Sequence, residues 1–98
     1  MTRIFTAVLA CAALPVLAQE SPAARSLAAT CAACHGTQGR SATQEVVSLA
    51  GLPREHIASQ MRAFREGSRP ATIMHQIAKG YSDQQIDLMA DYFSRRPR

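Results

Sequence analysis

A chain of 98 residues, 47% of them hydrophobic, has room for one compact domain. Its eleven Lys and Arg residues outnumber seven Asp and Glu residues, but the basic residues form no run longer than Arg95-Arg96 and tryptophan is absent, so a nucleic-acid partner is not expected. A domain this small buries a low fraction of its surface, and we expect a disulfide, a metal or a cofactor to complete its core.

The first segment has the layout of a secretory signal peptide. Arg3 supplies a positive charge, residues 4–14 form an uncharged apolar run, and small residues precede Gln19. We therefore predict that residues 1–18 are a signal peptide and that residues 19–98 form a mature domain in the periplasm. The apolar run is shorter than the roughly 20 residues that a helix needs to cross a bilayer, so stable membrane insertion is not expected.

Cysteine usage points to a cofactor. Cys11 resembles the acylated cysteine of a lipoprotein, but the short apolar run before it favours removal with the signal peptide. The mature chain then keeps Cys31 and Cys34, followed at once by His35. Cys-x-x-Cys-His is the attachment motif of c-type haem, and such a motif suits an exported chain. The alternative is a redox-active cysteine pair, but no strand pattern precedes Cys31.

Helix signals surround this motif. Ser21 and Pro22 read as an N-cap and a first helical residue, which predicts a helix through residues 23–33, followed by a polar loop. A second helix is expected from Pro53 to Gly67. Its apolar face holds Ile57, Met61 and Phe64, and its opposite, solvated face holds Arg54, Glu55, Arg62 and Arg65.

The C-terminal third has the clearest pattern. Pro70 separates a short apolar turn around Met74, for which we expect a loop or a one-turn helix, from the preceding helix. Ser82 and Gln85 then form a capping box that opens a last helix, whose apolar stripe is Ile86, Met89, Ala90 and Phe93. No alternating strand appears. We predict an all-α fold of three or four helices around one covalently attached haem.

In this motif Cys31 and Cys34 form thioethers with the haem vinyl groups and His35 is the proximal iron ligand. The second axial ligand is less constrained. Met61 and Met89 lie on apolar stripes that favour core packing, and His56 lies on a polar part of its helix. Met74 is favoured because its short segment suits the distal haem face, where Ile73 and Ile77 would exclude water. His75 as the ligand, or an open position suited to sensing or peroxidase-type chemistry, is the alternative.

Several segments resemble class I cytochromes c, in particular the c4-like proteins and the cytochrome subunits of flavocytochrome c sulfide dehydrogenases. The resemblance rests on the haem motif with Gly36, on residues 49–52, 69–74 and 77–83, and on Tyr92-Phe93. It implies that the first and last helices cross, with Ala24 or Ala28 meeting Tyr92 or Phe93, and that Met74 completes the iron coordination.

One departure from the family concerns the proximal histidine. Family members commonly carry a proline after the haem motif whose carbonyl accepts the ring proton of this histidine, but residues 36–52 contain no proline. The resemblance therefore leaves the carbonyl that faces His35 unidentified. A carbonyl at this position tunes the basicity of the ligand and the reduction potential.

These features indicate one-electron transfer rather than catalysis. The sequence shows no acid–base pair or nucleophile beyond the haem motif, so we expect an electron carrier that is not by itself an enzyme. Its partners are redox proteins, and the resemblance implies a sulfide-oxidising flavoprotein as the electron donor. Without Arg3 the net charge of the mature chain is about +3, which the two haem propionates would bring close to neutral.

Overall fold

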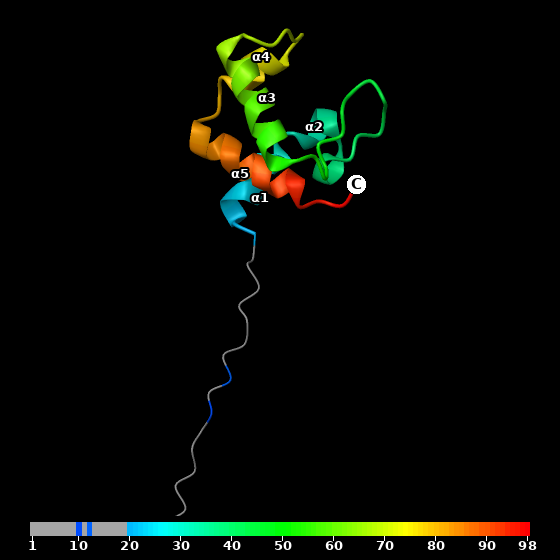
Figure 1. Ribbon diagram of the computed structural model, residues 1–98. Helices are drawn as coiled ribbons and strands as arrows, with labels where there is room; N and C mark the ends of the chain where they lie inside the picture. The colour runs from blue at the N-terminus through cyan, green and yellow to red at the C-terminus, as the bar shows by residue number, and fades with distance from the viewer. Residues whose placement is uncertain (1–9, 11, 13–19) are drawn as a thin grey trace, which may run out of the picture.

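The computed structural model describes residues 10, 12 and 20–98 (Figure 1). The predicted signal peptide, apart from residues 10 and 12, lies outside this part of the chain, as does Cys11. The described elements are α1 (Pro22–Ala29), α2 (Ala32–His35), the 3-10 helix η1 (Thr37–Gly39), α3 (Arg54–Glu66), α4 (Met74–Ala78) and α5 (Asp83–Ser94). The described residues include no strand, which confirms the all-α prediction.

The first helix is shorter than expected. Ser21 caps it as predicted, because its hydroxyl oxygen accepts from the Ala24 amide at 3.2 Å. The helix then ends at Ala29 instead of continuing to residue 33. The Cys31 amide bonds the carbonyl three residues back, which tightens the chain into a turn before α2 restarts the helix. The haem motif thus spans this turn and the one-turn helix α2.

The other helices begin and end where the sequence indicated. Gly67 follows α3 in the left-handed conformation, with φ of 80°, and lets the chain turn away from the helix. Met74 opens the one-turn helix α4. At α5 the capping box is complete, since the Gln85 amide donates to the Ser82 hydroxyl at 3.2 Å and the Gln85 side chain accepts from the Ser82 amide at 2.9 Å.

Helix α5 is the centre of the packing. It runs across the body with α1 on one side and α3 on the other (Figure 1). Small residues on α1, Ala24 and Ala28, are buried, which allows close approach to α5. This confirms the expected contact between the first and last helices. The main core cluster consists of Ala28, Ile57, Ala58, Ile86, Met89, Ala90 and Phe93.

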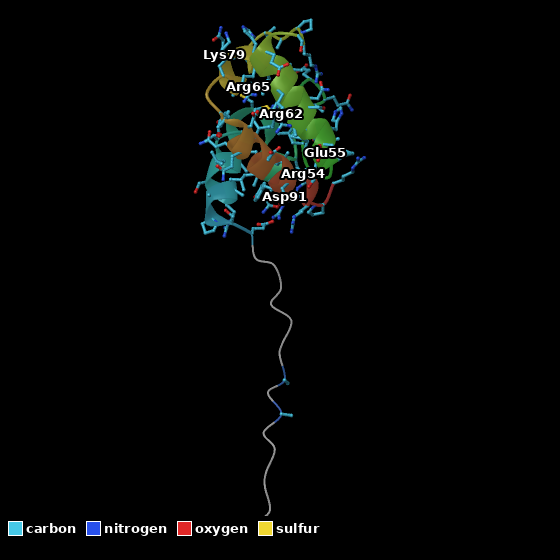
Figure 2. The ribbon with its side chains drawn as sticks, turned by 60° about the vertical axis from the view of Figure 1, so that its left-hand side comes forward. Arg54, Glu55, Arg62, Arg65, Lys79 and Asp91 are labelled. Atoms are coloured by element: carbon cyan, nitrogen blue, oxygen red, sulfur yellow. The ribbon has the colours of Figure 1, made fainter. Side chains whose placement is uncertain are left out.

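Charged side chains join α3 to α5, and the expectation of a solvated face is wrong for Arg62 and Arg65, although Arg54 and Glu55 are exposed as expected. Arg62 and Arg65 keep only 32% and 26% of their side-chain area exposed, because both reach toward carboxylates of α5. Arg65 bonds Asp83 at 2.6 Å, and Arg62 bonds Asp87 at 2.7 Å. Figure 2 labels charged side chains of α3 and α5 on the side of the molecule that faces the viewer, together with Lys79 at the end of α4. Sequence periodicity identifies the apolar face of α3 but cannot show that a charged neighbour covers the other.

Within residues 10, 12 and 20–98, no helix is both long enough and apolar enough to cross a membrane.

Candidate functional site

A cavity of about 180 Å³ lies beside the haem motif. Its walls come from the motif, from the loop before α3, from α3 itself, and from the segment that leads into α4. Most of the lining side chains are apolar, as a site for a flat porphyrin requires. The lining residues are Cys31, His35, Val47, Leu49, Leu52, His56, Ile57, Gln60, Met61, Phe64, Arg69 and Met74.

The proximal histidine is held by the loop between η1 and α3. The Nδ1 atom of His35 lies 2.7 Å from the carbonyl oxygen of Val47. Because a carbonyl only accepts hydrogen bonds, this contact requires the proton on Nδ1 and leaves the lone pair of Nε2 available for a metal. Val47 thus supplies the carbonyl facing His35 that the sequence left unidentified. Sequence patterns could not identify it, since any residue of a polar loop carries a carbonyl.

The two cysteines differ in their surroundings. Cys31 is half-buried beside the core and lines the cavity, whereas Cys34 is exposed. Burial raises the pKa of the Cys31 thiol, partly offset by the Thr30 hydroxyl, which lies 3.9 Å from its sulfur. Burial therefore disfavours the thiolate form of Cys31.

Of the side chains considered for the distal position, Met74 lines the same cavity as His35, and His75 does not. Met61 also lines the cavity, but it packs against the buried core, as expected for a filling residue. His56, expected to be solvated, is exposed and at the same time lines the cavity.

Shielding of the distal side differs from the expectation. Ile73 and Ile77 leave 57% and 36% of their surface exposed and are absent from the cavity lining. These two side chains therefore form no part of the cavity wall, and their exclusion of water from a bound haem stays a prediction. One-turn helices such as α4 have too few turns to bury several apolar residues on the same side.

The donor set fits a covalently held haem. The Cys31 thiol, the His35 imidazole and the Met74 thioether line the cavity, Cys34 follows in the same motif, and the remaining lining is largely apolar. Gln60 and Arg69 also line the cavity, which the sequence did not indicate. The hydrophobic periodicity of the sequence does not identify them, because Gln60 is a polar residue beside the apolar stripe of α3 and Arg69 follows the end of the helix.

Comparisons with known proteins agree with this chemistry. The family model for cytochrome c matches residues 21–95. The cytochrome subunit of sulfide dehydrogenase from Chlorobaculum tepidum is 42% identical over 67 residues, which cover 68% of this chain and 60% of that protein. The thiosulfate dehydrogenase electron acceptor from Thiomonas intermedia is 38% identical over 93 residues, which cover 90% of this chain and 43% of that protein. The chain thus spans less than two thirds of either relative.

A shorter relative and a solved structure extend the comparison. Cytochrome c-554(548) from Halomonas halodenitrificans is 34% identical over 79% of this chain and 96% of its own length. The structure of cytochrome c4 from Acidithiobacillus ferrooxidans superposes with a TM-score of 0.66 at 29% identity, covering 74% of this chain and 49% of that one. Covalently bound haem c is the cofactor of these proteins, and Cys31 and Cys34 fit its attachment motif. The chain belongs to the cytochrome c family of electron-transfer proteins.

Proposed function

We propose that this protein is a periplasmic one-electron carrier whose haem c is held by Cys31 and Cys34 and ligated by His35 and Met74. One observation carries the proposal: a histidine with its Nδ1 proton engaged and a methionine line the same largely apolar cavity. A bound haem iron supplies reversible change between ferric and ferrous states. The residues of this chain attach it, ligate it and exclude water from it.

Each residue has a separate role. The Cys31 and Cys34 sulfurs would hold the haem through thioether bonds to its vinyl groups. The motif that carries them begins at the turn between α1 and α2. The Nδ1–H group of His35 donates a hydrogen bond to the Val47 carbonyl oxygen, and Nε2 would ligate the iron. Met74 offers a thioether, which raises the reduction potential above that of a bis-histidine site.

The domain organisation follows from the same proposal. Residues 1–18 are the signal peptide and residues 19–98 the mature monohaem domain. A charged contact supports a domain that starts close to residue 19, since the Glu20 carboxylate pairs with the Arg96 guanidinium near the other end of the chain. Export to the periplasm suits the covalent attachment of haem c.

The partner that we propose is a flavoprotein that oxidises sulfide and passes electrons to the haem of this chain, which would then be the non-catalytic subunit of the complex. Support comes from the similarity to the cytochrome subunit of sulfide dehydrogenase. Two further relatives, 38% and 34% identical, are named as electron acceptors of thiosulfate dehydrogenase, an enzyme of another sulfur compound. A permanent subunit buries a large apolar interface, whereas a free carrier uses a small one.

Purification from the native host tests both the covalent haem and the proposed complex with a flavoprotein. The denatured protein, assayed as its pyridine haemochrome, is expected to carry one covalent haem per chain, and a flavin is expected to co-purify under native conditions. Covalent haem without flavin would reject the permanent flavoprotein complex and keep the carrier. Absence of covalent haem from the exported protein would reject the whole proposal.

A further inference from the structure

Tyr81 lies in the short connection between α4 and α5. Its backbone amide donates to the Ala78 carbonyl at 3.3 Å, which ties it to the end of α4. Its own carbonyl accepts from the Arg65 guanidinium of α3 at 3.4 Å. The side chain is half-buried and packs against the main core cluster. These contacts fix the position of Tyr81 relative to both α3 and α4.

The hydroxyl group of Tyr81 reaches the haem motif. It lies 2.7 Å from the Oγ1 atom of Thr30, the residue directly before Cys31. The Thr30 hydroxyl also lies 2.7 Å from the carbonyl oxygen of Leu27, which can only accept a hydrogen bond. Because the single proton of the Thr30 hydroxyl is used for Leu27, Tyr81 is the donor and Thr30 the acceptor in the bond between them.

This hydrogen bond connects the two sides of the proposed iron site. Among the hydrogen bonds of residues 20–98, it is the one that joins residues 20–35 to residues 70–82. The first segment carries His35 and both cysteines of the motif, and the second carries Met74. A covalent haem would be attached to the first segment, so the position of the second segment decides whether the Met74 sulfur reaches the iron.

Helix α4 has few anchors of its own. It is one turn long, and Ala78 is its one buried residue. Ile73, directly before it, and Ile77, within it, leave 57% and 36% of their surface exposed. Segments with so little buried apolar surface open locally at a low cost in free energy. A hydrogen bond that ties the end of α4 to the haem motif therefore has a large share in keeping this segment in place.

From these contacts we infer that Tyr81, through its hydrogen bond to Thr30, is a positioning residue that keeps the Met74 sulfur on the iron. This inference rests on the proposed ligation by His35 and Met74. Movement of α4 away from the haem would separate Tyr81 from Thr30, so their bond stabilises the closed arrangement over one in which the sulfur has left the iron. Tyr81 acts through the segment that carries Met74, since it does not line the cavity itself.

The test measures how readily imidazole replaces the Met74 sulfur on the ferric iron of the haem-loaded protein. The near-infrared charge-transfer band of the iron–thioether bond disappears as imidazole binds and reports the exchange. Tyr81→Phe keeps the ring and removes the donor, so it is expected to raise the apparent affinity for imidazole about fivefold, the factor that corresponds to one ordinary hydrogen bond. Tyr92→Phe makes the same change at another half-buried tyrosine, whose ring contacts Phe93 and Arg96, and is expected to match the wild type.

A second variant tests whether Thr30 is the partner. Thr30→Val keeps the branched shape and removes the acceptor, so it is also expected to raise the affinity for imidazole. In the Thr30→Val background Tyr81→Phe has no hydrogen bond left to remove and is expected to change the affinity little. Additive effects of the two substitutions would overturn the assignment of Tyr81 and Thr30 as one unit.

Met74→Ala separates ligation from general loosening of the fold. This variant has no thioether for imidazole to displace, so Tyr81→Phe is expected to leave its affinity unchanged. Equal affinities of wild type and Tyr81→Phe, or the same increase in the Met74→Ala background, overturn the inference while the band of the wild type keeps Met74 as the ligand. A wild type without the band rejects ligation by Met74 and the inference with it. If Tyr81→Phe does not fold, Thr30→Val takes its place in both comparisons.

Discussion

The Nδ1 atom of His35 lies 2.7 Å from the carbonyl oxygen of Val47, twelve residues later in the chain. This contact ties the proposed iron ligand to the loop that precedes α3, although the Val47 side chain is 61% exposed. The backbone of this residue, and not its side chain, therefore connects the loop to the iron site. A hydrogen bond of this kind increases the electron donation of the imidazole to a metal.

Val47→Gly is expected to weaken this hydrogen bond, because glycine loosens the backbone while the lost side chain is largely exposed. A less basic His35 stabilises the ferric state less, so the reduction potential is expected to rise, by up to about 59 mV for a tenfold change. Voltammetry gives the potential, and NMR of the ferrous protein gives the exchange rate of the Nδ1 proton, which is expected to increase.

Ala42→Gly is the matched control, since Ala42 is exposed in the same loop and the His35 ring is hydrogen-bonded to Val47 instead. Equal potentials and equal proton exchange in the Val47 and Ala42 variants would contradict a role for the Val47 carbonyl.

Gly39 is expected to be intolerant of a side chain for two reasons. Its φ of 78° costs an alanine about 1–2 kcal/mol, and a Cβ atom would lie 2.7 Å from the ring of Phe93 and 3.0 Å from the Ala50 amide nitrogen. Because Phe93 is only 2% exposed, its ring has little room to move. Gly39→Ala is expected to lower the free energy of unfolding of the haem protein by about 1–3 kcal/mol beyond the backbone cost. Unfolding in guanidinium measures this loss.

Gly67→Ala provides the comparison. Gly67 has a similar φ of 80°, but a Cβ atom there would meet nothing within 4 Å. The difference between the two variants thus isolates the crowding at Phe93. Equal losses of unfolding free energy would show that the Gly39 site is not tightly packed.

Asp83 is expected to make stability depend on acid pH. Hydrogen bonds from Arg65, and then from Arg62, lower the pKa of Asp83 below its ordinary value of 3.8. A carboxyl group with a lower pKa in the folded state stabilises the fold above the unfolded value and loses that contribution as the pH falls through the folded value. The stability gap between wild type and Asp83→Asn is therefore expected to be constant above about pH 5 and to shrink below pH 4.

Unfolding measured from pH 7 down to the acid transition tests this, with Glu45→Gln, a loop carboxyl that is exposed, as the control. If the difference in unfolding free energy between wild type and Asp83→Asn stays the same down to acid pH, the ion pairs of Asp83 contribute nothing to stability.

Local signals in the sequence predicted much of the fold. The capping box at Ser82, the N-cap at Ser21 and the glycine after α3 are each made by residues within four positions of one another, so the pattern alone identifies them. The sequence did not predict the early end of α1, because residues 23–33 are almost all helix formers. No helix-breaking residue marks the tight turn at Cys31.

Part of the candidate site could likewise be predicted from local sequence, and part of it could not. The motif at Cys31 and His35 is contiguous and could be recognised, and Met74 could be ranked by its place after Pro70. The Val47 carbonyl and the Arg69–Gln60 pair depend on tertiary contacts that span nine or more residues. Such contacts leave no periodic pattern in the sequence, so the sequence alone does not identify them.

The identity of the distal ligand is the central claim and has a direct test. An iron–thioether bond gives the ferric protein a charge-transfer band in the near infrared. The wild type, His75→Ala and Met61→Leu are expected to show this band, and Met74→Ala is expected to lose it while keeping its covalent haem. A Met74→Ala protein that retains the band, or a wild type that lacks it, would contradict ligation by Met74.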